Sequence, residues 1–496
     1  RISAMEDHQW RGVVTAMGSP AWADRFATVE ARIEAPEEID QHVAAWAATR
    51  TKREAETELQ ANGVPATAVY SPGEILDSPQ LTHRQAFEPL PVGGGREAKV
   101  VGLPFRIVAG GNEVAPERRK RRSLRGLRVL EASRVLAVPL AGAILGALGA
   151  QVTKLEDLPR LDMYRRRGPY IEGEPGMERS AYFALMNHSK ASAAFDVDAA
   201  RDRLDALVGS SDVVIENFGR KRAGALGLSA SVGPAAHLDL LAVSSSGFGQ
   251  DGPYADYRAY AYNLQASGAL GFLTRNLDGE SAEIDIAWAD LISAFGLATI
   301  IAAWAVGPAG NAGAGIDFSM TDLIVAHFND YLAAASLDRG IDDADRANEL
   351  APFTPNGVYP ATDGWLAISV AGDEQYARLV EALGEDAFLS SDFASVEGRT
   401  AHRRELDALL AETTARHAAG NLAAALRRAG VFAEEVLDAG DLVQDTQLAT
   451  RECFVPVEHP EWGRKRLFGL PWRPYGGRAL RLGTPPLLGG ETPVAP

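Results

Sequence analysis

The chain has 496 residues, of which 46% are hydrophobic and 23% charged, a composition typical of a soluble globular protein with about three domains. Its formal net charge of −17 argues against nucleic acid or an anionic membrane as a general partner. A single cysteine, Cys453, leaves no disulfide framework and is typical of a reducing cytosol, so we predict a cytoplasmic protein.

The N-terminal segment, residues 2–106, is similar to residues 368–473 of the same chain. The offset between the two segments is 366 at first and 367 after a one-residue gap. Pairs of identical residues run along the whole length: Ile2/Ile368, Asp7/Asp373, Gln9/Gln375, Gly18/Gly384, Phe26/Phe393, Arg32/Arg399, Gly63/Gly430, Leu81/Leu448, Arg84/Arg451, Phe87/Phe454 and Pro104/Pro471. A repeat this long predicts tandem duplication of a domain rather than a solenoid array.

The second copy has a preceding half, which begins near Ser123, whereas the first copy has none. We therefore expect a parent protein that continues upstream by about the length of residues 123–366. Residues 117–122, Glu-Arg-Arg-Lys-Arg-Arg, stand where the first copy ends and are predicted to form a basic, solvated linker.

From Leu127 onward, short apolar runs alternate with helical stretches, which predicts a doubly wound parallel α/β sheet. The predicted strands cover residues 128–131, 150–156, 193–197, 212–216, 238–243 and 365–370. The longest apolar stretches, 135–150 and 291–306, have about 16 residues each. Because a bilayer span needs about 20, we predict buried helices at both places.

The remaining elements are expected to be mainly helical. A helical stretch is predicted from Gly315 toward Ala334, followed by a crossing at residues 351–357 that is punctuated by Pro and Gly. Residues 379–383 and 405–426 are predicted helices of a smaller domain, and the chain after Gly469 is expected to be extended.

Several segments, taken together and in this order, resemble the family III CoA-transferases. The segments are Leu127–Val135, Leu148–Glu156, Glu216-Asn217-Phe218, Gly249–Tyr254 and Ala361–Trp365. The resemblance covers residues 123 to about 490, and residues 2–110 resemble the C-terminal half of the same family. None of these motifs is decisive alone.

The resemblance implies an α/β fold with a Rossmann-like large domain and a smaller α-rich domain, of the kind that interlocks in dimers. In this chain the implied bounds are residues 1–116 for the first half-copy, 123–335 for the large domain, 336–455 for the small domain and 456–496 for a return to the large domain. A tandem fusion is expected to supply both halves of such a dimer, so a homodimer or an intrachain pseudo-dimer is predicted.

The family's chemistry needs a carboxylate that carries first an acyl group and then CoA. By family match this nucleophile is Asp290, at the start of the apolar stretch 291–306. An Asp directly before an apolar helix is also what an ordinary helix N-cap looks like. The two roles are partly compatible, because a helix N-terminus stabilises an ionised carboxylate.

The CoA site is expected to combine backbone donors, a few cations and an apolar slot. The family match assigns it Arg134, Val135, Ala137, Phe195, Asn217, Phe218 and Arg258. Each of these also fits an ordinary loop or core residue. Coenzyme A is expected to be a substrate, with a small carboxylic acid as acceptor, and we predict no permanently bound cofactor and no metal.

Three departures from the family pattern make oxalate an unsafe guess for the acceptor. Ala191 stands where Arg is usual, residues 219–222 replace a step that contains Pro-Gly, and Ala261 replaces an acidic residue. Related racemases share the Asp but add a His in the segment that here reads 259–268, which has none. A non-catalytic scaffold role fits the first copy, which has no equivalent of Asp290.

Overall fold

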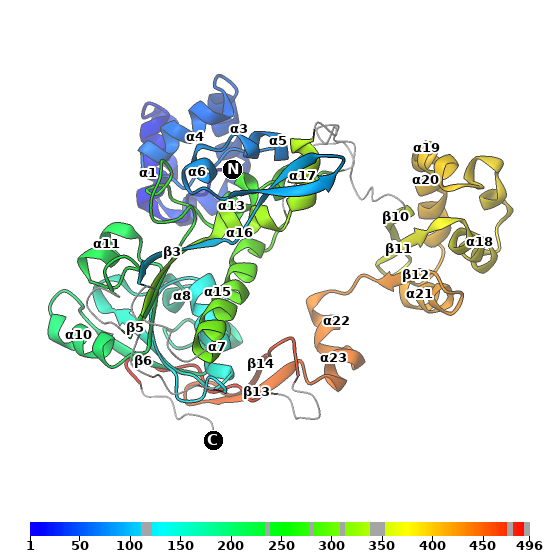
Figure 1. Ribbon diagram of the computed structural model, residues 1–496. Coiled ribbons are helices and arrows are strands. Elements are labelled where there is room, and N and C mark those ends of the chain that lie inside the picture. The colour runs from blue at the N-terminus through cyan, green and yellow to red at the C-terminus, as the bar shows by residue number, and fades with distance from the viewer. Residues whose placement is uncertain are drawn as a thin grey trace. The chain divides into compact units, whose positions relative to one another are not determined.

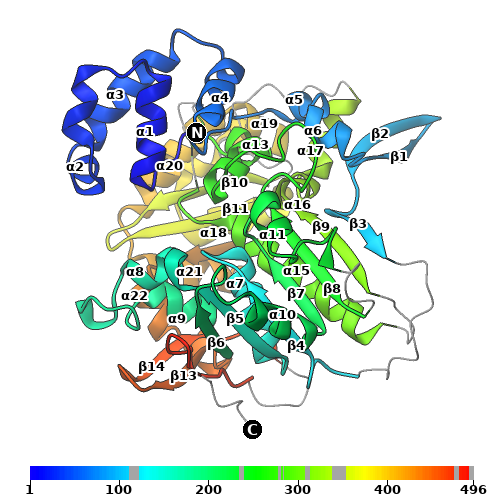
Figure 2. The same ribbon diagram turned by 90° about the vertical axis from the view of Figure 1, so that its left-hand side faces the viewer.

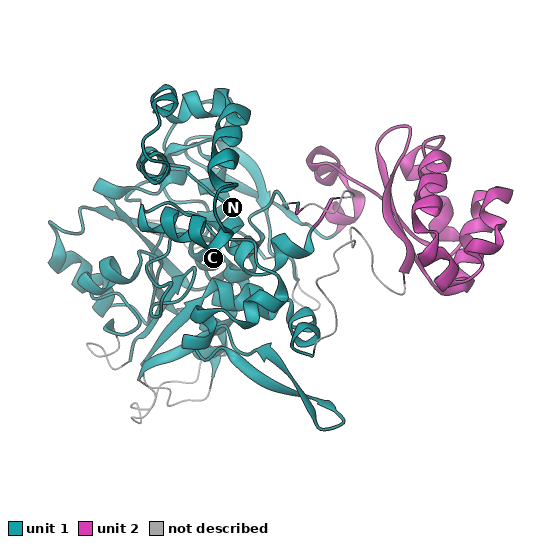
Figure 3. Cartoon of the chain, turned by 90° about the horizontal axis from the view of Figure 1, so that it is seen from above, with its two compact units in different colours: residues 1–274, 282–342, 451–496 teal, residues 275–281, 343–450 magenta. Residues whose placement is uncertain are grey.

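The computed structural model describes residues 1–110, 122–233, 239–276, 281–282, 284–307, 313–337, 353–473 and 480–490. Apart from its last residue, the predicted linker 117–122 lies outside these ranges. The chain divides into two compact units (Figure 3). The first unit comprises Arg1–Thr274, Ala282–Asp342 and Arg451–Pro496, and the second comprises Arg275–Ser281 and Asp343–Thr450.

A seven-stranded sheet forms the centre of the first unit (Figure 1). Its strands lie in the order β3(Phe105–Gly110), β9(Ala314–Ser319), β8(Leu241–Ser246), β7(Val213–Glu216), β4(Arg128–Ala132), β5(Gln151–Asp157) and β6(Lys190–Phe195). All neighbours are parallel except β3, which pairs antiparallel with β9. The Rossmann-like α/β prediction is thus confirmed. The strand order reverses between β4 and β7, and such switch points are where open α/β sheets bind ligands.

Two apolar helices, α7(Ala137–Ala147) and α15(Trp288–Val306), pack against this sheet in one hydrophobic core (Figure 2). Ile144, Leu297 and Ile301 are buried there together with Val129 of β4. By length and composition α15 is the one helix among the described residues that is apolar enough to cross a membrane. Its buried face in the core of an α/β unit gives a sufficient reason for this composition.

The other helices of residues 122–337 are short. They are α8(Met163–Arg166), α9(Ala181–Asn187), α10(Arg201–Gly209), α11(Arg220–Ala225), α13(Ala261–Ser267), α14(Leu270–Leu273), α16(Met320–Ala326) and α17(Asn329–Ser336).

The first repeat copy belongs to the first unit. Its elements are α1(Asp7–Ala16), α2(Val29–Glu34), α3(Pro36–Ala47), α4(Lys52–Ala61), α5(Pro72–Leu76), α6(Pro79–His83), β1(Phe87–Gly93), β2(Arg96–Val101) and then β3 of the central sheet. Trp10, Val13, Phe26 and Leu59 form a small core within this copy. Capping boxes begin α4 and α5, where Thr51 and Ser71 each bond a Glu three residues on.

The second copy begins in the second unit. A three-stranded antiparallel sheet, β10(Phe353–Pro360), β11(Trp365–Ala371) and β12(Phe432–Glu435), is accompanied by α18(Gly372–Leu383), α19(Val396–Ala401), α20(Arg403–Thr414) and α21(Ala419–Arg428). The chain continues through α22(Ala439–Gln444), α23(Thr446–Thr450), β13(Phe454–His459) and β14(Gly463–Phe468). At the offset of 367, α2, α3, α4, α6 and β2 coincide in both bounds with α19, α20, α21, α23 and β14.

Three predictions about single elements are wrong. Residues 314–319 form strand β9 instead of the start of a helix, because they pair with β8 and β3 and are buried from Gly315 to Ser319. Residues 353–357 belong to strand β10, not to an irregular crossing. The stretch 405–426 is two helices, α20 and α21, separated by a break near His417.

The first copy is anchored to the large domain by two side chains of its α6 segment. Arg84 is fully buried and bonds Asp317 at 2.6 Å and Asp322 at 2.8 Å. Gln80 donates to the carbonyl oxygens of Phe248 and Asp251. The loop that receives them contains two glycines with positive φ, Gly249 and Gly252, where a Cβ would collide with Arg84 and Gln80. This close approach explains why glycine stands at both positions.

Candidate active site

The loops that follow β4 and β7 meet at the switch point of the sheet. Asn217 accepts a hydrogen bond from the backbone nitrogen of Arg134 at 3.0 Å and donates one to its carbonyl oxygen at 2.8 Å. The guanidinium of Arg134 lies over the ring of Phe218, 5.4 Å from its centroid. The amide of Asn217 therefore ties the two loops together and leaves the Arg134 side chain on an aromatic support.

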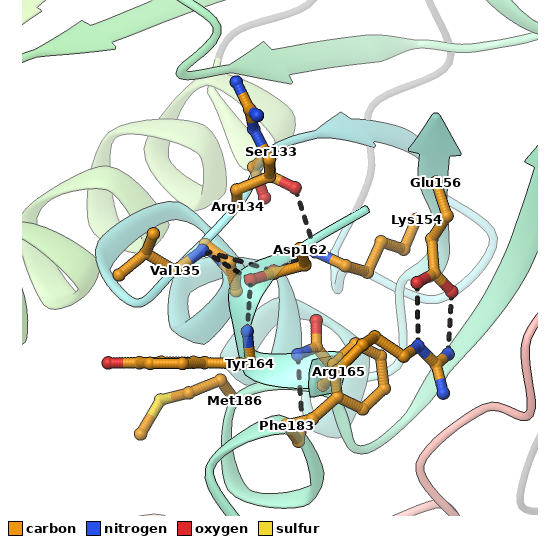
Figure 4. A network of polar contacts seen from close by, with 12 residues as sticks. Ser133, Arg134, Val135, Lys154, Glu156, Asp162, Tyr164, Arg165, Phe183 and Met186 are labelled. Carbon is orange, nitrogen blue, oxygen red and sulfur yellow. Dashed lines mark hydrogen bonds and ion pairs between the residues drawn. The ribbon is translucent and has the colours of Figure 1, made fainter. Parts of the chain in front are cut away.

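Val135 adopts a left-handed conformation, with φ of 72°, just before α7. This conformation is costly for a β-branched residue and is typical of strained functional loops. Both carboxylate oxygens of Asp162 accept from the Val135 backbone nitrogen at 3.2 Å, and the buried ammonium of Lys154 lies 3.4 Å from Asp162 (Figure 4). Lys154 also donates to the carbonyl oxygen of Ser133. A buried ion pair thus holds the strained turn in place.

Asp290 lies in the first turn of α15, and the helix N-cap is Ala287. Asp290 is therefore not the cap residue, which separates it from the ordinary N-cap role. Its half-buried carboxylate has no hydrogen-bond partner among the residues that the structure describes. Burial raises the pKa of Asp290 to about 7. A desolvated carboxylate without a partner is poorly stabilised by its surroundings, and such groups mark functional sites.

Asp290 opens into a cleft of about 520 Å³ that is lined by the large domain and by the first repeat copy, both of which belong to the first unit. The large domain contributes Arg134, Val135, Ala137, Asn217 and Arg258. The first copy contributes Glu6, His8, Gln9 and Pro65. Gln9 donates to the hydroxyl of Tyr260, another lining residue, at 2.9 Å.

Six of the eight residues expected in the site from the sequence line this cleft, namely Asp290, Arg134, Val135, Ala137, Asn217 and Arg258. Phe218 does not line the cleft itself, but its ring lies beneath the guanidinium of Arg134, which does. Phe195 is buried in a separate core with Leu155 and Leu204, and the guanidinium of Arg203 lies over its ring. The structure thus places Phe195 among core residues and not in the cleft lining.

Sequence reasoning missed the residues that the first copy brings to the cleft. His8 and Pro65 are far from Asp290 along the chain, so no local motif joins them. One signal was present: His8 stands beside the repeated Gln9, but the second copy has Glu374 at the matching position. Within the described residues, no group of three or more His, Cys, Asp or Glu side chains is arranged to hold a metal ion.

A family model matches nearly the whole chain in two segments. The family model described as CoA-transferase family III matches residues 1–117 and residues 124–492. The two matched segments are separated by the region of the predicted basic linker.

Individual relatives agree with this match. The chain is 30% identical over 345 residues to a succinate–glutarate CoA-transferase of Agrobacterium fabrum. The aligned region covers 68% of this chain and 85% of the relative. It is 28% identical over 356 residues to a succinyl-CoA–D-citramalate CoA-transferase of Chloroflexus aurantiacus, covering 70% and 86%. A CaiB/BaiF family protein from Brucella suis has a similar structure, with a TM-score of 0.62, 30% identity and coverage of 75% of this chain and 95% of that one.

Proposed function

The chain belongs to CoA-transferase family III and is a CoA-transferase, and from this premise we propose that Asp290 is the nucleophile that carries CoA from an acyl-CoA donor to a carboxylic acid. The observation that carries the proposal is the carboxylate of Asp290 in the cleft, with its raised pKa and without a hydrogen-bond partner among the described residues. The named relatives act on dicarboxylic acids, so dicarboxylates are the first substrates to test.

The proposed reaction has four balanced steps. The Asp290 carboxylate attacks the thioester carbonyl, which releases CoA thiolate and leaves a mixed anhydride. The thiolate then attacks the Asp290 carbonyl, forms an aspartyl thioester and releases the donor acid. The acceptor carboxylate attacks that thioester and again releases the thiolate. Finally the thiolate attacks the acceptor's carbonyl in the new anhydride, which gives the new acyl-CoA and the free Asp290 carboxylate.

Burial of Asp290 suits these reaction steps, because water near the aspartyl anhydride or thioester would hydrolyse either intermediate. Arg134, Val135, Ala137, Asn217, Phe218 and Arg258 are proposed to bind CoA, as the family resemblance implies. Arg134 and Arg258 provide cations for phosphates, and the Val135 turn exposes backbone at the start of α7. Phe195 lies in the separate core and is not part of this proposed site.

Trapping of the aspartyl intermediate tests the proposal. The protein is incubated with succinyl-CoA, and the Asp290 peptide is analysed by mass spectrometry for a CoA adduct. Asp290→Asn should abolish transfer with an unchanged fold, whereas Asp330→Asn, the matched change at an exposed first-turn aspartate of α17, should leave the rate unchanged. Transfer by Asp290→Asn above about a few per cent of the wild-type rate would reject the nucleophile, since covalent catalysis needs the carboxylate.

We further propose that the two matched segments arose by tandem duplication and that the first copy takes the place of a dimer mate, in a homodimer or an intrachain pseudo-dimer. Support comes from the coincidence of elements at the offset of 367 and from the first-copy residues in the cleft. The proposed divisions are residues 1–116, 117–122, 123–335, 336–455 and 456–496. We propose that coenzyme A is a substrate and that the enzyme has no permanently bound cofactor. The proposed location of the protein is the cytoplasm.

A racemase-like activity is the second candidate, because the structure brings a histidine to the cleft. The segment 259–268 has no His, but His8 of the first copy lines the same cleft as Asp290. A pair of this kind is what proton exchange next to a thioester carbonyl needs. Incorporation of deuterium at the α-carbon of a 2-methylacyl-CoA in deuterated water would favour the racemase, and CoA transfer without such exchange would exclude it.

A further inference from the structure

His8 and Arg258 bring two nitrogen atoms together in the cleft, and we propose that this pair binds an anionic oxygen group of a substrate. Nε2 of His8 lies 3.5 Å from Nη1 of Arg258, and both residues line the cleft of Asp290. The group is either a phosphate of CoA or a carboxylate of the acid. The inference rests on the proposed function for the identity of the substrates. It assigns the first repeat copy a part in substrate binding.

The first copy holds Arg258 in position from several sides. The side-chain amide of Gln60 accepts from the Arg258 backbone nitrogen and donates to its carbonyl oxygen, both at 2.9 Å. Nη1 of Arg258 donates to the carbonyl oxygen of Gly63 at 3.4 Å. Gly63 has φ of 74°, and a side chain there would lie against the guanidinium. The backbone of Arg258 is thus clamped, and its guanidinium is directed toward His8.

The nearby acidic groups are engaged with other cations. Glu6, which lines the cleft, pairs with Arg167 at 3.0 Å, and Asp7 pairs with Arg32 at 2.7 Å. Within the described ranges, neither His8 nor Arg258 has an acidic partner. His8 also lies in the first turn of α1, where the helix dipole favours a negative charge. Two adjacent nitrogens that lack a carboxylate are arranged to receive one from a ligand.

The internal repeat shows that the fold does not require histidine at this position. Gln9 and Gln375 cap their helices in the same way, since each accepts from the backbone nitrogen four residues earlier. The neighbouring residue differs, although both are exposed: His8 lines the cleft, whereas Glu374 pairs with Arg378. The same helix start therefore tolerates an acid in the second copy. A role in the cleft accounts for the histidine.

The variant His8→Glu installs the residue that the second copy carries, so the helix is expected to fold. It should raise the KM for one substrate about tenfold or more, because a charge-assisted hydrogen bond is replaced by repulsion. Arg11→Ala is the matched control: it changes the formal charge of the exposed face of α1 by the same amount and also installs the residue of the second copy, Ala377. It should leave both KM values within about twofold.

The two substrates separate the possible ligands. A rise in KM for succinyl-CoA alone identifies a CoA phosphate, and a rise for glutarate alone identifies the acid's carboxylate. Unchanged KM values for both overturn the proposal. Calorimetric titration of CoA and glutarate into wild type and His8→Glu gives an independent readout. If His8→Glu weakens binding but the wild type forms no Asp290 adduct, the proposed function is rejected and the anion site is kept. If the wild type forms the adduct but His8→Glu leaves binding unaltered, the anion site is rejected and the proposed function is kept.

Discussion

Residues 2–106 and residues 368–473 share five elements with the same bounds at the offset of 367, but they use their common residues differently. Arg32 and Arg399 make matching contacts. Arg32 donates to the carbonyl oxygen of Phe26 and pairs with Asp7, and Arg399 donates to that of Phe393 and pairs with Asp373. Each guanidinium also lies over an aromatic ring of its own copy. These residues serve the fold of the copy itself.

Among the residues that the structure describes, a second class of repeated side chains has a partner in one copy alone. Arg84 is buried between Asp317 and Asp322, whereas its counterpart Arg451 is exposed. Gln80 is buried against the large domain, whereas its counterpart Gln447 is exposed. The comparison thus separates side chains that build the copy from side chains that attach it to a large domain. Similarity within the repeat, by itself, does not distinguish the two.

The largest expected effect breaks this attachment. Arg84→Met should lower the free energy of unfolding by about 3–5 kcal/mol, because it leaves the buried Asp322 without its cation and the buried Asp317 with Arg106 alone. Arg451→Met, the same change in the second copy, should cost no more than about 0.5 kcal/mol, as for most exposed positions. Urea unfolding followed by tryptophan fluorescence measures both. Equal losses in the two variants would contradict the division into attachment and fold.

Substitution of the shared fold residues should have similar effects in both copies. Arg32→Met and Arg399→Met each remove charge-assisted hydrogen bonds and a cation–π contact, and each should cost about 2–3 kcal/mol. Hydrogen exchange measured by mass spectrometry should show faster exchange in α1 and α2 for the first variant and in α18 and α19 for the second. If only one of the two variants shows faster exchange in its own copy, the repeated arginines are not equivalent.

A milder test of attachment uses the glutamines. Gln80→Ala leaves the carbonyl oxygens of Phe248 and Asp251 without their donor and should cost about 2 kcal/mol. Gln447→Ala should be neutral within error. Thermal unfolding is sufficient for the comparison, and a midpoint that shifts equally in both variants would argue against the assignment of Gln80.

The smallest expected effect concerns pH and extends the comparison to catalysis. Asp290 must be ionised to attack, and burial raises its pKa to about 7, so kcat/KM should fall about tenfold for each pH unit below that value and level off above it. Arg451→Met should show the same profile, because Arg451 does not line the cleft. A flat profile between pH 5 and pH 8 would show that Asp290 does not limit the rate by its ionisation.

Much of the fold was predictable from the sequence, because local pattern determines it. The strands β4, β5 and β7 and the helices α7 and α15 follow directly from the position and length of their apolar runs. Strand β9 was missed because Asp317 and Ser319, which are buried, interrupt its apolar pattern. Asp317 is buried because it pairs with Arg84 and with Arg106, which lie more than 200 residues earlier in the chain.

The site was predictable to the extent that it depends on the ends of strands. Arg134 and Asn217 follow β4 and β7, and neighbouring parallel strands bring their loops together. The contribution of His8 and Gln9 was not predictable, because it depends on how one copy packs against another part of the chain. Asp162 was missed for a related reason: its role is to hold the Val135 backbone, and a backbone strain leaves no mark in the sequence.

Strand β3 has a consequence for the timing of folding. Phe105 pairs with Phe318 in the central sheet, so this pairing closes a loop of more than 200 residues. At ordinary rates of synthesis, β3 leaves the ribosome on the order of ten seconds or more before β9 exists. Until then the first copy has only its own small core around Trp10 and Phe26. The working cleft therefore forms late, after the chain has closed this distant contact, and slow long-range pairing should limit the rate at which active enzyme appears.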